Sequence, residues 1–87
     1  MNYEREKAVG QFLVLKKQIY ELGIKAQSFV NDIQQEINSF DESEKDFSNM
    51  DFKKVRTLSN ELIKLQAEYD SKKKEMLRLK ETYNIEE

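Results

Sequence analysis

Apolar residues recur at alternating steps of three and four from Val55 to Tyr83. This spacing fills the a and d positions of a heptad repeat, which is typical of a long helix that packs lengthwise on another helix. One polar residue, Lys72, stands at a d position inside this seam. The pattern predicts a helix over about residues 50–84 whose core side chains are Val55, Leu58, Leu62, Leu65, Tyr69, Met76, Leu79 and Tyr83.

A second apolar stripe, with 3.6 residues per turn, predicts a helix over about residues 3–39. Gly23 allows two interpretations of it. The helix either ends there, with Gly23 left-handed and Ile24 packed back on Ile19, or continues at a cost of roughly 1 kcal/mol. The stripe keeps its phase across Gly23, which favours the continuous helix. The side chains predicted to form its half of the core are Phe12, Leu15, Ile19, Leu22, Phe29 and Ile33.

The segment between the two stripes, about residues 40–49, is acidic and polar and predicts a loop. Ser48 followed by Asp51 resembles a capping box, which places the start of the second helix near residues 49–51. Phe40 and Phe47 are expected to cover the end of the core. The chain from Ile85 onward is expected to fray.

Two long helices of similar length, joined by a short polar loop, predict an antiparallel hairpin. The expected fold is therefore all-α: a coiled-coil-like two-helix hairpin that forms one domain over residues 1–87. The 87 residues include no Pro and only two Gly, which suits long unbroken helices.

The first helix carries more apolar surface than a hairpin needs. A second arc lies roughly 140° from its core stripe at about 100° per residue, and a weaker second arc on the other helix contains Phe52, Ile63 and Leu77. Such surplus usually marks an interface. A bend at Gly23 that buries the arc, dimerisation into a four-helix bundle, and docking on an unrelated protein all remain open. The predicted contact residues are Val9, Leu13, Tyr20, Gly23, Ile24 and Leu77.

The absence of His and Cys removes the commonest general base, the commonest transition-metal ligand and every thiolate site. The acidic loop also lacks the glycine and the regular ligand spacing of a calcium loop. We therefore expect no catalytic residue, metal site, cofactor or small-molecule substrate, and no enzymatic activity.

Partners other than proteins are not indicated. Lys72, Lys73 and Lys74 form a basic segment, but neighbouring acids dilute it and the net charge is −2, so nucleic acid is not an expected partner. The most apolar run, residues 12–15, is far shorter than the roughly 20 residues that span a bilayer. With a polar N-terminus as well, the expected location is cytoplasmic, without membrane contact.

Residues 58–65, Leu-Ser-Asn-Glu-Leu-Ile-Lys-Leu, resemble the Ser-Gln-Glu-Leu-Asp signature of small Spo0E-like aspartyl-phosphate phosphatases. That family consists of helical hairpins that act on phosphorylated response regulators. Ile63 stands where the signature has its Asp, so the resemblance implies binding of such a regulator without phosphatase activity. The residues themselves favour a non-enzymatic protein–protein interaction module, such as a small adaptor, chaperone or inhibitor, with a nucleic-acid complex as a further alternative.

Overall fold

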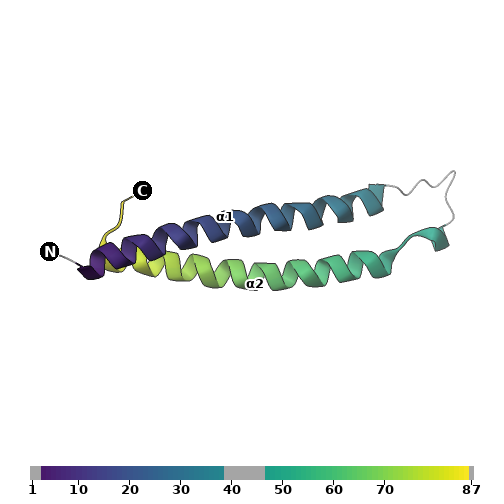
Figure 1. Cartoon of the computed structure of the whole chain (residues 1–87). Coiled ribbons are helices and arrows are strands. Elements are labelled where there is room, and N and C mark those ends of the chain that lie inside the picture. Colours follow the sequence, from purple (N-terminus) through teal and green to yellow (C-terminus); the bar gives the residue numbers. More distant parts are fainter. Residues whose placement is uncertain (1–2, 39–46, 87) are drawn as a thin grey trace.

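The computed structural model describes residues 3–38 and 47–86. They form α1 (Tyr3–Asn38), a short 3-10 helix η1 (Phe47–Asn49) and α2 (Phe52–Tyr83), and these described ranges contain no strand. The two long helices lie antiparallel in a rod of 69 × 18 × 14 Å (Figure 1). The prediction of an all-helical, two-helix protein is confirmed for this part of the chain.

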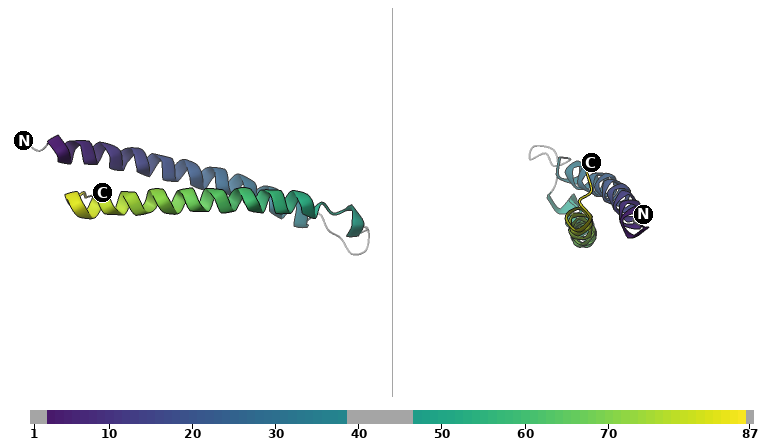
Figure 2. Two further views of the ribbon diagram at one scale, coloured as in Figure 1. Left: turned by 90° about the horizontal axis from the view of Figure 1, so that it is seen from below. Right: turned by 90° about the vertical axis from the view of Figure 1, so that its left-hand side faces the viewer.

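Helix α1 passes through Gly23 without interruption, which confirms the continuous helix. No glycine has a positive φ, so Gly23 does not act as a left-handed helix stop. The two views of Figure 2 show that α1 is inclined to α2 rather than strictly parallel to it. An inclination of this kind is expected when rows of side chains on one helix pack into the grooves of another.

Helix α2 is capped by Asp51, whose carboxylate Oδ1 accepts a hydrogen bond from the Lys54 backbone N–H at 2.9 Å. The predicted capping box at Ser48 is wrong, because Ser48 lies in η1 and the helix begins after Asp51. The Asp51 backbone N–H also donates to the Glu36 carboxylate at 3.0 Å. This bond ties the start of α2 to the last turns of α1.

The C-terminal end of α2 is closed by a Schellman-type cap. Asn84 is left-handed (φ 55°, ψ 47°), and the backbone N–H groups of Asn84 and Ile85 both donate to the Lys80 carbonyl. The cap turns Ile85 back into the core, where it is buried. The predicted fraying is therefore wrong for Ile85. Arg5 adds a clamp, donating from Nε to the Tyr83 carbonyl at 3.3 Å.

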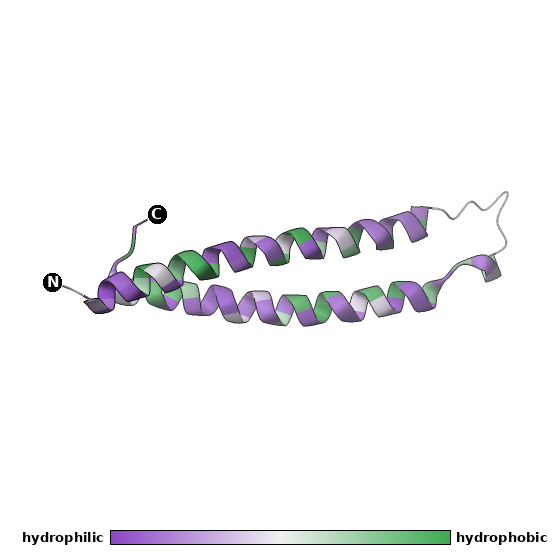
Figure 3. Cartoon of the chain, viewed as in Figure 1, coloured by the Kyte–Doolittle hydropathy of each residue, from purple (hydrophilic) through white to green (hydrophobic). Residues whose placement is uncertain are grey.

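The predicted core residues are all buried or half-buried in the structure, while Ile37, further along the same stripe, is exposed. The core is densest where the N-terminal turns of α1 meet the C-terminal end of α2, and the apolar turns there are green in Figure 3. Elsewhere in the described ranges the seam is only half-buried, apart from Leu65. The residues that form the dense cluster are Ala8, Phe12, Leu79 and Ile85.

At the loop end, Phe47 does not cover the core as predicted. Phe47 is exposed, and its ring packs instead on that of Phe52, with centroids 5.4 Å apart. Phe40 lies outside the described residues. Among the described residues, the apolar core is therefore closed at the end where the two chain termini meet.

Candidate protein-binding surface

Large apolar side chains remain exposed along one side of the hairpin. On α1, Leu13, Tyr20 and Ile24 are 56%, 71% and 56% exposed. On α2, Ile63 is 63% exposed and Leu77 is 44% exposed. Together with Gly23 these residues define a surface that we call the open face. Large apolar side chains left in water on one side of a small chain usually mark an interface.

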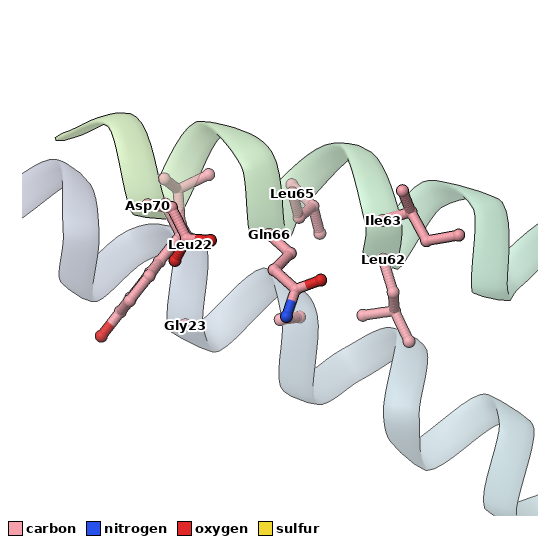
Figure 4. Close-up of a pocket in the computed structure, with 9 residues that line it drawn as sticks. Leu22, Gly23, Leu62, Ile63, Leu65, Gln66 and Asp70 are labelled. Carbon is pink, nitrogen blue, oxygen red and sulfur yellow. The ribbon is translucent and has the colours of Figure 1, made fainter. Parts of the chain in front are cut away.

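Two adjoining grooves show that the residues of both helices share this side. Gly23 and Tyr69 line both grooves, which have volumes of about 430 and 490 Å³. The first groove lies between the helices and reaches Ile63 and Asp70, as Figure 4 shows. The second runs over α1 and is lined, besides Gly23 and Tyr69, by Lys16, Ile19, Tyr20, Ile24 and Gln27.

A hydrogen bond across the seam indicates the register of the two helices. The Lys72 ammonium donates to the Gln18 side-chain carbonyl at 3.0 Å, which places these residues level with each other. Equal steps in opposite directions along the antiparallel helices then place Leu13 level with Leu77. By the same count, Tyr20 lies level with Asp70 on the other helix. The two halves of the open face therefore run side by side along the rod.

One alternative for the surplus arc is wrong. Helix α1 does not bend at Gly23, and the side chains of Leu13, Tyr20 and Ile24 are not buried within the chain. Val9, predicted to belong to the contact surface, is half-buried and packs against the core cluster instead. Its position beside Ala8 and Phe12, where the core is densest, explains this difference.

The sequence reasoning missed three residues of the surface. Tyr69 was assigned wholly to the core, yet it lines both grooves, and Gln66 and Asp70 line the one between the helices. Their spacing contained the signal, because Gln66 lies three residues after Ile63, three before Tyr69 and four before Asp70, and residues three and four apart are neighbours on a helix surface. Two of them are polar, so the apolar pattern of the sequence does not include them.

Gly23 is not required by the packing of the hairpin itself. A Cβ added at Gly23 would meet no heavy atom within 4 Å, and the same holds at Gly10. Replacing Gly23 with alanine should therefore raise the free energy of unfolding by about 0.5–1 kcal/mol, because alanine restricts the unfolded chain and favours helix.

The stability of the Gly23→Ala variant can be measured by urea denaturation at the lowest usable protein concentration. Gly10→Ala is the matched control and should give a similar gain. A Gly23→Ala variant less stable than the parent, beside a more stable Gly10→Ala, would contradict the open space seen at this position.

The ion pair of Glu75 and Arg78 on α2 does not resemble a catalytic acid. Arg78 donates to the Glu75 carboxylate and lowers the pKa of that exposed carboxyl by this hydrogen bond, the reverse of what a general acid needs. In the described ranges no group of acidic side chains could hold a metal ion. Neither helix there has a stretch long and apolar enough to cross a bilayer.

The basic segment of α2 is not a continuous patch. Lys72 turns into the seam toward Gln18, and its ammonium lies 4.0 Å from the Glu68 carboxylate. The Lys73 ammonium lies 5.9 Å from the centre of the Tyr69 ring. Lys74, the third lysine, is exposed and makes neither of these contacts. The three ammonium groups therefore do not form one organised site for a phosphate backbone.

Comparison with known proteins adds no relative. A scan against models of protein families finds no match, and searches of curated proteins and of solved structures find none. The function of the chain must therefore be inferred from the open face and from the helices that form it.

Proposed function

We propose that this chain is a non-enzymatic protein–protein interaction module that binds a helical partner through the open face. The observation that carries the proposal is the exposure of Leu13, Tyr20 and Ile24 on α1. Tyr20 and Ile24 line a groove that shares Gly23 and Tyr69 with the groove between the helices. A helix laid into such a groove buries apolar side chains from both sides, which is a recurrent mode of recognition. A partner that supplies two helices would complete a four-helix bundle, and dimerisation is one way to supply them.

The thin core supports this proposal. Within the described ranges only Ala8, Phe12, Leu65, Leu79 and Ile85 are buried, and four of them gather at one end. Chains of this size often gain the rest of their stability from association. A partner on the open face would cover the half-buried middle of the seam, including Tyr69.

Replacing Leu13 and Tyr20 together with glutamate should abolish partner binding and leave the helices intact. Glutamate is a good helix former, but two carboxylates in a desolvated interface cost several kcal/mol. We expect capture of host proteins by the tagged chain, and any self-association in sedimentation velocity, to fall at least tenfold. Far-UV circular dichroism should show unchanged helix content.

Val14→Glu is the matched control, because Val14 is 55% exposed on α1 but lies outside the open face. This variant should bind as the parent does. Unchanged capture and association by the Leu13/Tyr20 double variant would refute the open face as the binding surface. Loss of helix content would instead show that these side chains belong to the core.

A further inference from the structure

We infer that a second copy of this chain occupies the open face, in an antiparallel dimer whose two-fold axis lies level with Gln18 and Lys72. This inference rests on the proposed function, because it names the partner of the same surface. In this arrangement α1 lies on α1 of the second copy and α2 lies on α2. The two loops point to opposite ends of the resulting four-helix bundle.

The exposed area of the chain exceeds that of a compact protein by more than a standard dimer interface removes. The chain exposes 7044 Å², whereas a compact monomer of 10.4 kDa would expose about 5,400 Å². A standard interface removes about 800 Å² from each partner. The hairpin therefore carries enough excess surface to form such an interface and still remain as exposed as an ordinary protein.

Shape along α1 is self-complementary about the proposed axis. Leu13 and Gly23 are equally far from Gln18 in sequence, on opposite sides of it. A two-fold axis at this level therefore places Leu13 of each copy over Gly23 of the other. The exposed Leu13 side chain then fills the open space above Gly23, where no heavy atom lies within 4 Å of a Cβ position. This contact also accounts for a glycine in the middle of a long helix.

One pair of opposite charges on α2 is symmetric about the same axis. Asp70, which lines the groove between the helices, and Lys74, which is exposed, flank Lys72 at equal distance. The axis brings Asp70 of each copy to Lys74 of the other, which forms two opposite-charge pairs. A parallel dimer would instead lay α1 on α2 and bring Leu13 of each copy level with Leu77 of the other.

Disulfide crosslinking tests the register, because the chain contains no cysteine. We propose to mix the single variants Leu13→Cys and Gly23→Cys and to oxidise the mixture. A crosslinked dimer should form in the mixture and in neither variant alone. Leu13 lies roughly 15 Å from its own symmetry mate at 1.5 Å per residue, beyond the reach of a disulfide.

A mixture of Val14→Cys with Gly23→Cys is the control and should not crosslink. Crosslinking between Leu13→Cys and Leu77→Cys in place of the expected pair would demonstrate a parallel dimer and overturn the inference. A monomer at high concentration in sedimentation equilibrium would also overturn it. The interaction module itself would survive that result if the chain still captured a host protein that the Leu13/Tyr20 double variant lost.

A charge exchange tests the pairs on α2. Asp70→Lys or Lys74→Asp alone should weaken dimerisation by roughly tenfold or more, because each creates two like-charge contacts in the interface. The double variant restores both pairs with reversed sign and should recover most of the affinity. Equal affinities for the parent and both single variants would overturn this assignment of the axis.

Discussion

Replacing Phe12 with alanine should lower the free energy of unfolding by about 3–5 kcal/mol. Phe12 is 2% exposed and packs at the centre of the terminal cluster with Ala8, Leu79 and Ile85. Truncation to alanine leaves a cavity in this cluster, because the surrounding side chains relax only partly into the vacated space. Because small domains are stable by only about 5–15 kcal/mol, this single change removes a large part of the total. Thermal and urea denaturation followed by circular dichroism measure the loss.

Val14→Ala is the matched control for Phe12→Ala, because Val14 is an exposed apolar residue on the same helix. Its effect should stay within about 0.5 kcal/mol. If the two substitutions destabilised the protein equally, the terminal cluster would not be the main source of stability. Contacts made by the open face would then be the main candidates for the source of stability.

Replacing Gln18 and Lys72 together with leucine should raise the free energy of unfolding by about 1–4 kcal/mol. The Lys72 side chain is only 26% exposed and interrupts the heptad seam between Tyr69 and Met76. Its ammonium loses part of its hydration there, and the hydrogen bond to Gln18 compensates for part of that loss. Two leucines avoid that desolvation and bury apolar surface instead.

The same double substitution should also allow the two helices to pack in more than one alignment. A polar residue at one core position of a coiled coil selects a single alignment at a cost in stability. We expect the parent to show one set of backbone amide resonances and the leucine variant to show additional sets. Lys64→Leu, at an exposed position on α2, is the control and should change neither property. A less stable leucine variant would show that the polar pair is a net source of stability.

The period of the apolar residues was sufficient to predict two long helices and the side chains between them. Val55, Leu58 and Leu62 repeat at heptad spacing, and that spacing alone specifies which side of a helix must be covered. The local caps were harder to predict. Ser48 and Asp51 both carry side-chain oxygens suited to an N-cap, and the choice depends on where Glu36 and η1 hold the backbone.

The end of α2 shows a second limit of local patterns. Asn84 followed by Ile85 is the sequence of a left-handed cap with an apolar contact, but the pair stabilises a cap only if something receives Ile85. The core cluster with Ala8 and Phe12 provides that contact, and it comes from the other end of the chain. An isolated α2 would have no such partner for Ile85.

The sequence by itself determined the helical hairpin, the core residues within the two helices and the presence of surplus apolar surface, because these follow from periodicity along one chain. Only the tertiary structure decided which surplus residues are exposed. It buried part of Val9, left Leu13, Tyr20 and Ile24 in solvent, and joined Tyr69 and Asp70 to the same surface. The physical reason is that exposure depends on how far one helix covers the other, which the inclination of α1 and the Gln18–Lys72 register set together.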